Sequence, residues 1–357
     1  MESLSVSEII RKIQKFPKKN LIHLPTPLHK LENLSQALGG PEIFIKRDDL
    51  TGLALGGNKS RKLEFIIHDV LDKGADVIIT WASLQSNWCL QTAAAARKFG
   101  ITPILILFKT YDLPEEYDGN LLLDFILDAD IKIREGPKGS VVKAEDVEEI
   151  LEEIILDIKE GGHSPYVAPI GGSMVGGSME KPLGAISYVS AFVEMLEQAE
   201  AHGFEMDYVI HASGSGGTQA GLAVAAKALK GGTKVLGISV SDDKETFGKD
   251  VLTVAKDTVN ALGLDLEINK EDIIVFDEYI GEGYGIINKE VSDTIRFAAK
   301  KEGIFLDPVY TGKAMLALFD LIKKGYFKKE DKVVFCHTGG TPALFPNKDK
   351  ISKFLGL

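Results

Sequence analysis

Thr51-Gly-Leu-Ala-Leu-Gly-Gly-Asn-Lys-Ser-Arg-Lys62 links two segments of different character. Residues 42–46 in front of it are short and apolar, as in a strand, whereas residues 62–71 behind it have the apolar spacing of a helix. The sequence therefore predicts a strand–loop–helix unit in which Lys59 lies just inside the start of the helix.

Lys59 is the first candidate for chemistry. Gly56 and Gly57 allow the backbone to bend in front of it without steric cost. A lysine amine in such a place can form a Schiff base with a carbonyl compound if its surroundings lower its pKa. The alternative is a solvated lysine, which is slightly unfavourable because helix N-termini disfavour cations. This stretch alone leaves both interpretations open.

The composition is ordinary for a globular protein with more than one core. The chain has 357 residues, of which 45% are hydrophobic and 26% charged, and its net charge is −11 without a basic block. The length favours two domains. The charge argues against nucleic acids and anionic membrane surfaces as partners.

The cysteines and the apolar runs point to a cytoplasmic protein. Cys89 and Cys336 match no zinc or redox spacing. The first residues lack the basic and apolar regions of a secretory signal. The longest apolar runs, such as residues 104–108, are too short to cross a bilayer.

Strand and helix patterns alternate from residue 42 onward. This alternation predicts an α/β fold with open, mostly parallel sheets covered by helices on both faces. Residues 1–41 are expected to hold one short amphipathic helix, and the glycine-rich residues 161–177 lie midway, as a domain crossing would. Strands are predicted near residues 42–46, 76–80, 103–108, 131–134, 165–168, 208–212, 234–240, 272–276 and 332–336, and helices near 60–72, 87–99, 119–128, 144–160, 181–202, 218–229, 245–262, 288–302, 312–324 and 347–355.

The strongest ligand signal is the turn Ser213-Gly-Ser-Gly-Gly-Thr-Gln-Ala-Gly221, which follows a predicted strand and opens a predicted helix. Its glycines expose successive N–H groups, and the helix start adds positive potential, so the turn favours a phosphate group. A dinucleotide fingerprint fails at Gln219, where a third glycine is needed, and no Walker lysine follows. A tight turn without a ligand is the alternative. The candidate phosphate-binding residues are Gly214, Ser215, Gly216, Gly217 and Thr218.

Three other loops carry polar residues at junctions of the same kind. Ser86, followed by Asn87, is a good N-cap for a helix whose free N–H groups would suit a carboxylate. Tyr310 and Thr311 open another helix, and Thr338 follows the last predicted strand. Ligands in open parallel sheets bind beyond the carboxyl ends of the strands, so these loops could converge on one crevice. Taken singly, the serine and the threonines are better explained as helix caps.

Two tyrosines are candidates for proton transfer or substrate binding. Tyr284 lies in the irregular segment 279–285, which we expect to be an active-site loop, and Tyr310 lies at the junction described above. A buried structural tyrosine is the commoner case. The histidines and acidic residues show no H-E-x-x-H pattern, so we predict no catalytic metal, and no G-x-S-x-G elbow occurs.

Taken together, these motifs resemble the tryptophan-synthase-β-like, or fold type II, pyridoxal-phosphate enzymes. Within them the chain resembles the branch of 1-aminocyclopropane-1-carboxylate (ACC) deaminase and D-cysteine desulfhydrase. The resemblance covers nearly the whole chain, and its most specific block is residues 56–64. The motifs are Leu24-Pro-Thr-Pro-Leu28, Ile45-Lys-Arg-Asp-Asp49, Gly56-Gly-Asn-Lys-Ser-Arg-Lys-Leu-Glu64, Gln85-Ser-Asn87, Gly214-Ser-Gly-Gly-Thr218, Asp307-Pro-Val-Tyr-Thr-Gly-Lys313 and His337-Thr-Gly-Gly340.

The resemblance implies a role for each candidate residue. Lys59 would hold pyridoxal 5′-phosphate as a Schiff base and later take the substrate's Cα proton. Ser86 and nearby N–H groups would bind the substrate carboxylate. The remaining implied roles are Asn58 beside the lysine, Asn87 at the ring oxygen, Gly214 to Thr218 at the phosphate, Tyr284 and Tyr310 beside the substrate, and Thr311 and Thr338 near the ring nitrogen and the substrate side chain.

The two threonines indicate which reaction of the branch to expect. The ring-opening deaminase would carry a glutamate in place of Thr311 and a leucine in place of Thr338. A carboxylate beside the ring nitrogen would keep that nitrogen protonated, whereas a neutral hydroxyl does so less, and β-elimination needs less such help. The resemblance therefore implies a lyase that converts D-cysteine to pyruvate, ammonia and sulfide, with ACC deamination, or elimination from another β-substituted amino acid such as cysteate or serine, as alternatives.

The sequence departs from the family pattern after Gln-Ser-Asn, where Trp88 replaces the usual histidine. An indole has one donor and no acceptor, so the substrate's side chain and chirality stay open. The resemblance further implies a homodimer and two domains. The larger, pyridoxal-phosphate-binding domain would comprise residues 1–60 and 178–357, and the smaller, residues 61–177, would close over the small amino-acid substrate.

Overall fold

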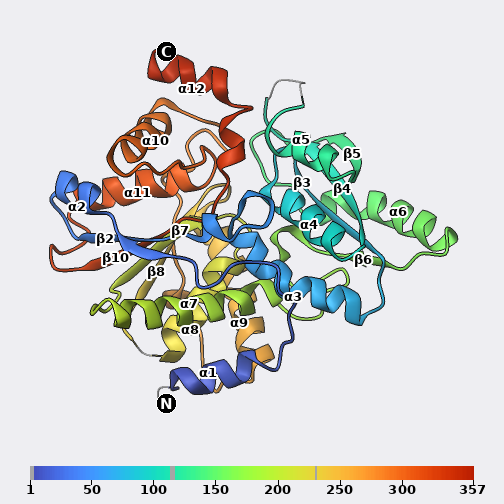
Figure 1. Ribbon diagram of the computed structural model, residues 1–357, viewed down its shortest axis with the longest axis horizontal. Coiled ribbons are helices and arrows are strands. Elements are labelled where there is room, and N and C mark those ends of the chain that lie inside the picture. Colours follow the sequence, from blue (N-terminus) through green and yellow to red (C-terminus); the bar gives the residue numbers. More distant parts are fainter. Residues whose placement is uncertain (1–3, 113–116, 230) are drawn as a thin grey trace.

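The computed structural model describes residues 4–112, 117–229 and 231–357, which form two sheets with helices packed around each (Figure 1). The larger sheet has the strand order β1-β2-β10-β7-β8-β9 and the smaller has the order β5-β4-β3-β6. Every neighbouring pair is parallel except β1 with β2. The predicted α/β class with mostly parallel sheets is therefore confirmed.

The elements follow one another along the chain much as the apolar patterns predict. The strands are β1 (Leu28–Lys30), β2 (Glu42–Lys46), β3 (Val77–Ser83), β4 (Thr102–Lys109), β5 (Asp130–Glu135), β6 (Pro165–Val167), β7 (Tyr208–Ser213), β8 (Lys234–Ser239), β9 (Ile274–Phe276) and β10 (Lys332–Cys336). The α-helices are α1 (Val6–Ile13), α2 (Glu32–Leu38), α3 (Asn58–Asp72), α4 (Asn87–Lys98), α5 (Gly119–Ile126), α6 (Glu148–Glu160), α7 (Leu183–Ala201), α8 (Gly217–Leu229), α9 (Lys244–Leu262), α10 (Lys289–Glu302), α11 (Thr311–Lys323) and α12 (Lys348–Leu355).

Both faces of the larger sheet are covered, because its central strands are apolar on both sides. In β7, Val209 packs into the core shared with α7, α8 and α9, whereas Ile210 packs into the core shared with α10 and α11 (Figure 1). Both side chains are fully buried. This arrangement leaves the carboxyl ends of the strands as the place where loops can form a site.

The smaller sheet is built in the same way. Ile78 of β3 faces the core that includes α4, and Ile79 faces the core that includes α6. Its four strands lie between residues 77 and 167, within the range predicted for the smaller domain. Residues 1–3 and 230 of the larger range and residues 113–116 of the smaller range lie outside the described residues, and the domain boundaries stay a prediction. Within the described residues, no helix has the length and apolar character needed to span a membrane.

Two elements near the N-terminus were not predicted. Residues 1–41 hold the helices α1 and α2 and the strand β1, rather than a single helix. Helix α2 is 7 residues long and ends at Gly39 in the left-handed conformation, and β1 has 3 residues. Elements this short carry too few apolar positions for a period to be visible.

A buried ionic cluster ties α3 to the rest of the protein. The Arg61 guanidinium donates to Asp48 at 2.7 and 2.9 Å and to Glu194 of α7 at 2.9 and 3.0 Å. The Tyr188 hydroxyl donates to Asp48 at 2.6 Å, and the Lys46 amine donates to Glu194 at 2.5 Å. Burial alone would raise the pKa of Asp48, but the charges of Arg61 and Lys46 and the hydrogen bonds from Arg61 and Tyr188 together outweigh burial and lower it. Because Arg61 lies two residues after Lys59, the cluster fixes the first turn of α3.

Candidate active site

The turn in front of Lys59 requires glycine at both of its bends. Gly56 has φ +79°, and a Cβ there would lie 1.9 Å from the backbone oxygen of Asp49. Gly57 has φ +135°, and a Cβ there would lie 3.0 Å from the backbone oxygen of Thr338. The loop after β2 therefore packs directly against the loop after β10. This contact brings Lys59 and Thr338 to the wall of one cavity.

The amine of Lys59 is suited to reaction with a carbonyl. It lines the cavity, and no hydrogen bond or ion pair engages it among the described residues. Burial lowers its pKa to about 8. A substantial fraction of the amine is then neutral near physiological pH, which is the form that attacks an aldehyde.

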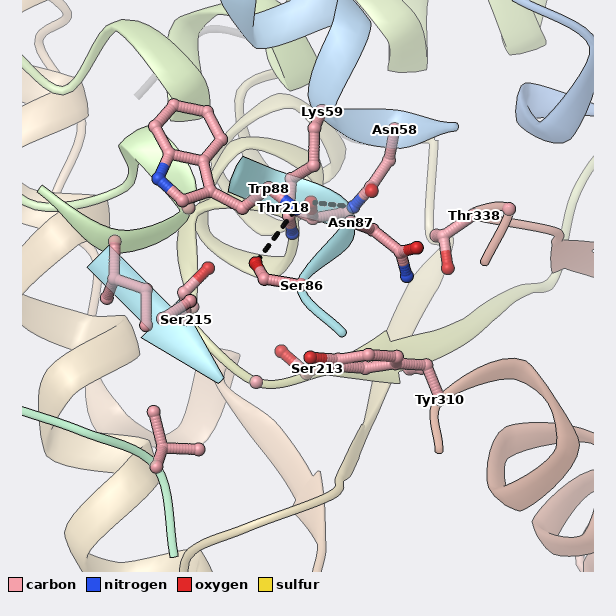
Figure 2. A pocket seen from close by; sticks show the side chains of 18 of the residues that line it. Asn58, Lys59, Ser86, Asn87, Trp88, Ser213, Ser215, Thr218, Tyr310 and Thr338 are labelled. Carbon is pink, nitrogen blue, oxygen red and sulfur yellow. Dashed lines mark hydrogen bonds between the residues drawn. The ribbon is translucent and has the colours of Figure 1, made fainter. Parts of the chain in front are cut away.

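The glycine-rich turn after β7 lies across the cavity from Lys59 (Figure 2). Gly214, Ser215, Gly216 and Thr218 line the cavity, whereas Gly217 is the first residue of α8 and is not part of the lining. The Asn58 amide donates to the Thr218 hydroxyl at 3.2 Å and so joins the two helix starts. This geometry is that of a helix N-terminus open to an anion.

A second lysine, Lys62, was missed by the sequence analysis. It is fully buried one turn after Lys59 and donates to Gly171 O at 3.0 Å and to Ser173 Oγ at 3.3 Å. Ser173 Oγ in turn lies 2.9 Å from Ser215 Oγ on the turn after β7. Burial, together with the charge of Lys59, lowers the pKa of Lys62 well below its usual value. The signal was its spacing of three residues from Lys59, which places both on one face of the helix.

Ser86 and Asn87, at the start of α4, form a further part of the cavity wall. Ser86 Oγ accepts from the backbone N–H groups of Trp88 at 3.1 Å and Cys89 at 3.2 Å, so the predicted N-cap of α4 is present (Figure 2). Both Ser86 and Asn87 also line the cavity. Capping and a place in the site are thus not alternatives here, because the Ser86 hydroxyl proton is not needed for capping.

Trp88 contributes an apolar wall rather than a polar group. Its indole N–H donates to Thr80 Oγ1 at 2.6 Å, and the side chain is buried. The ring lies at one side of the cavity (Figure 2), against Gly172. The single donor of the indole is therefore used within the protein, and a ligand would meet only the carbon atoms of the ring.

The two predicted tyrosines meet at the bottom of the cavity. The hydroxyl oxygens of Tyr284 and Tyr310 lie 2.5 Å apart, and that of Tyr284 lies 3.2 Å from Ser83 Oγ. Burial raises the pKa of both phenols, so they stay neutral and act as hydrogen-bond donors. The structure brings both into the lining.

The two predicted threonines differ in position. Thr338 lines the cavity, but Thr311 is fully buried and absent from the lining. The Thr311 hydroxyl donates to Asp307 Oδ1 at 2.7 Å and accepts from the Asp307 backbone N–H at 2.8 Å. Thr311 therefore stabilises the start of α11, and the interpretation as a helix-start residue describes its contacts here.

The loop that carries Tyr284 is held by a buried lysine. Lys313 Nζ donates to the carbonyl oxygens of Ile280 at 2.7 Å and Gly283 at 3.0 Å. The Tyr284 N–H donates to Gly139 O at 2.7 Å, which fixes the loop from the side of the smaller sheet. Burial lowers the pKa of Lys313 to about 8.

Replacing Lys313 by methionine is expected to lower kcat/KM by roughly 10- to 100-fold, because a displacement of about 1 Å in a positioning group has that effect. The change removes both contacts to the loop and leaves the Ile280 and Gly283 carbonyls without this donor. Steady-state kinetics measures the loss. Lys323→Met, at an exposed position of the same helix, is the control and should leave kcat/KM unchanged. Equal effects of the two changes would contradict this role.

The fold and the cavity are those of a fold type II pyridoxal-phosphate enzyme. Residues 20–339 match the family described as pyridoxal-phosphate dependent enzyme, and the chain belongs to that family. The cofactor predicted from the sequence is thereby confirmed.

Individual relatives show which branch of this family the chain resembles. The D-cysteine desulfhydrase of Klebsiella pneumoniae (strain 342) is 40% identical over 339 residues, which is 94% of this chain and 98% of the relative. A Pyrococcus furiosus protein, 40% identical over 346 residues (96% of this chain and 98% of the relative), is assigned by name, provisionally, to 1-aminocyclopropane-1-carboxylate deaminases. A crystal structure of an ACC deaminase homologue has a TM-score of 0.86 and 37% identity over 97% of this chain and 99% of that one. The predicted branch is confirmed.

Pyridoxal phosphate fits the residues present. The turn 214–218 offers backbone N–H groups at a helix start, and the Ser213 hydroxyl beside it is buried without a partner among the described residues. Lys59 supplies a partly neutral amine on the opposite wall. An aldehyde and a phosphate at the two ends of one molecule match these two features.

Proposed function

We propose that this protein is a lyase that uses pyridoxal phosphate to eliminate the β-substituent of a small amino acid, with D-cysteine as the substrate that is converted to pyruvate, ammonia and hydrogen sulfide. The proposal is supported by the similarity to D-cysteine desulfhydrases over nearly the whole chain. It also agrees with the chemistry of the cavity wall.

The observation that carries the choice of reaction is the absence of a carboxylate from the wall. Within the described part of the chain, the lining contains one lysine, several hydroxyl and amide groups, and no aspartate or glutamate. Thr338 is neutral at the place where the resemblance puts the ring nitrogen or the substrate side chain. Elimination of a good leaving group needs less electron withdrawal than opening a carbon–carbon ring, so this neutral wall favours elimination.

The proposed roles follow from the contacts. When bound, pyridoxal phosphate supplies an aldehyde for the lysine and the substrate amine, and an electron sink for the bond that breaks. Lys59 Nζ holds the cofactor and later takes the Cα proton. The Ser86 hydroxyl donates to the substrate carboxylate. Tyr284 and Tyr310 are hydrogen-bonded to each other, and the hydroxyl proton that this bond leaves over points toward the substrate side chain. The proposed cofactor residues are Asn58, Asn87, Gly214, Ser215, Gly216, Gly217, Thr218 and Thr338, and Thr311, outside the lining, supports the start of α11 through Asp307.

Trp88 favours a small, uncharged leaving group. Its indole N–H is bonded to Thr80, so it offers no donor to an anionic group such as a sulfonate. A thiol fits an apolar ring better than a charged group does. Among β-substituted amino acids, cysteine is therefore the preferred choice, and cysteate is disfavoured.

A panel of D- and L-amino acids, scored for pyruvate release by the purified protein with pyridoxal phosphate, tests the proposal. D-cysteine is expected to give kcat/KM at least tenfold above L-cysteine, D-serine and cysteate. ACC deamination is the second candidate, favoured by the provisionally assigned relative and the solved homologue, and it is scored by release of 2-oxobutyrate. Preferred turnover of the cyclopropane substrate would overturn the choice of elimination.

The assembly and the location belong to the same proposal. We expect a homodimer, in keeping with the family resemblance, and residues 61–177 as a unit that closes over substrate. A cytoplasmic location agrees with two free, buried cysteines. Light scattering on the purified protein would return twice the chain mass of 38.8 kDa, and the mass of a single chain would contradict the dimer.

A further inference from the structure

Asp124, on α5 behind the cavity, is a buried carboxyl that the proposed function does not use. Its side chain is fully buried, and neither of its oxygens receives a hydrogen bond from any described residue. A buried carboxylate without donors is unfavourable, so this position requires either a partner or a proton.

The neighbouring unpaired atom is on Asn120, one turn earlier in α5. The Asn120 amide Nδ2 donates to Gln85 O at 2.9 Å and to Asn87 Oδ1 at 2.8 Å. With both donors directed to those acceptors, Asn120 Oδ1 points away from them, and it is buried without a partner among the described residues. Helical side chains lean toward the N-terminus, so Asp124 leans over the turn that carries Asn120.

A proton on Asp124 would satisfy both residues at once. A neutral carboxylic acid has one O–H donor, and Asn120 Oδ1 is an acceptor at the i−4 position that lacks one. Ionised Asp124 would instead face that oxygen with another negative group. The buried pair is therefore complete in only one protonation state.

We propose that Asp124 is a positioning residue that stays protonated, donates to Asn120 Oδ1, and through Asn120 holds the Asn87 amide in the orientation that presents its Nδ2 to pyridoxal phosphate. This inference rests on the proposed function for the identity of the ligand. It adds a chain of hydrogen bonds, from Asp124 through Asn120 to Asn87, that leads from the interior of the smaller sheet's helices to the cavity wall.

The charges around Asp124 agree with a protonated group. Burial raises its pKa to about 8. The Asp124 carboxyl faces the thiol of Cys89 on α4. Burial is the main cause that raises the pKa of this thiol, and Asp124 is the second. At the N-terminus of α5, Asp118 is paired with Lys348 at 3.2 Å, and beyond its C-terminus Arg97 of α4 donates to Leu127 O at 2.9 Å. In the segment after β10, Asn347 Oδ1 is likewise buried without a partner among the described residues.

Deprotonation of Asp124 has a defined consequence for the cavity. Above about pH 8 its carboxylate would repel Asn120 Oδ1 and favour rotation of the Asn120 amide, which would withdraw Nδ2 from Asn87 Oδ1. Asn87 would then lose the contact that fixes its own amide. Weaker binding of pyridoxal phosphate should follow, by about fivefold to tenfold, the usual effect of one lost hydrogen bond.

Three variants separate this role from simple packing. Asp124→Asn keeps a donor for Asn120 but cannot ionise. Asp124→Leu removes the donor. Asp128→Asn, at an exposed carboxylate just after the same helix, is the control. The probe is pyridoxal phosphate itself, whose dissociation constant is measured by fluorescence quenching between pH 6 and pH 9.5.

The titration of Lys59 is common to the wild type and the variants, so it cancels in the ratio of their dissociation constants. The dissociation constant of the wild type, divided by that of Asp124→Asn, should be near 1 at pH 6 and rise about fivefold to tenfold by pH 9.5. Asp124→Leu should bind about fivefold to tenfold more weakly at every pH, and Asp128→Asn should behave as the wild type. A flat wild-type ratio, or normal binding by Asp124→Leu, would overturn the proposal.

A second measurement needs no cofactor. The group is protonated in the folded apo-protein and ionised in the unfolded chain between about pH 4 and pH 8. The unfolding constant of the wild type, relative to Asp124→Asn, should therefore rise up to about tenfold per pH unit across that window and level off above it. Parallel pH profiles would overturn the proposal even if Asp124→Leu fails to fold. A wild type that binds no pyridoxal phosphate would instead overturn the proposed function, and the role at Asn87 with it.

Discussion

Lys59→Ala is expected to abolish covalent attachment of pyridoxal phosphate and to lower kcat/KM by roughly 10³-fold or more, because one amine is asked both to hold the cofactor and to move the Cα proton. No other lysine lines the cavity within the described residues. The two nearest alternatives, Lys62 and Lys313, are engaged by backbone carbonyl oxygens. The measurements are the absorbance of the bound cofactor and the rate of pyruvate release.

A control variant and the pH dependence of cofactor attachment both test the role of Lys59. Lys73→Ala, at the far end of the same helix, should leave both readouts unchanged. Because burial lowers the pKa of Lys59 to about 8, the neutral fraction of the amine rises about tenfold per pH unit below that value and levels off above it. The rate of cofactor attachment to the apo-protein should follow this curve. A Lys59→Ala protein that keeps the absorbance band would show that another lysine carries the cofactor.

Arg61→Met is expected to lower the free energy of unfolding by about 3–5 kcal/mol, the usual effect of removing one partner from a buried ion cluster. Asp48 and Glu194 would keep their negative charges without the guanidinium that now pairs with both. Asp48 is fully buried, so solvent cannot replace the lost partner. Urea unfolding of the apo-protein, followed by circular dichroism, measures the loss.

The pH dependence of stability identifies the cause. Within the cluster, burial raises the pKa values of Asp48 and Glu194, but the charge and hydrogen bonds of Arg61, together with the smaller contribution of Lys46, outweigh burial and leave both pKa values lowered. Their contribution is therefore present above the unfolded-state pKa near 4 and is lost as the pH falls through the lower folded-state values. Arg61→Met should lose this acid dependence. Arg47→Met, which removes a partner only from the more accessible Asp49, should cost about 1 kcal/mol or less, and an equal loss would refute the special role of the buried cluster.

The fold was predictable because its signals are local. Both faces of the central strands are buried, so β7 and β10 are mostly apolar in sequence, and glycine turns mark the starts of α3 and α8. The elements missed, β1 and α2, have 3 and 7 residues. They are held by tertiary contacts, such as the pairing of β1 with β2, rather than by a pattern of their own.

The site was predictable where a residue type and a backbone requirement coincide. Lys59, which follows two glycines at positive φ, and Ser86 at a helix start meet that condition. Thr311 met it too, but its hydroxyl is used by Asp307 instead of the cavity. A hydroxyl can serve a helix start or a ligand, and only the position of the neighbouring carboxylate decides between them.

The supporting groups were not predictable, because their roles depend on partners distant in sequence. Lys62 bonds to Gly171 and Ser173, more than 100 residues away. Lys313 holds a loop about 30 residues upstream. Asp124 is distinguished by the absence, among the described residues, of a donor to its oxygens, and an unpaired atom leaves no mark in the sequence.

The most direct test of the account is to reduce the wild-type protein with borohydride in the presence of pyridoxal phosphate and to map the modified peptide by mass spectrometry. We predict a single added phosphopyridoxyl group, located on Lys59. A protein that gains no mass, or that carries the group on Lys62, Lys313 or a surface lysine, would contradict the account.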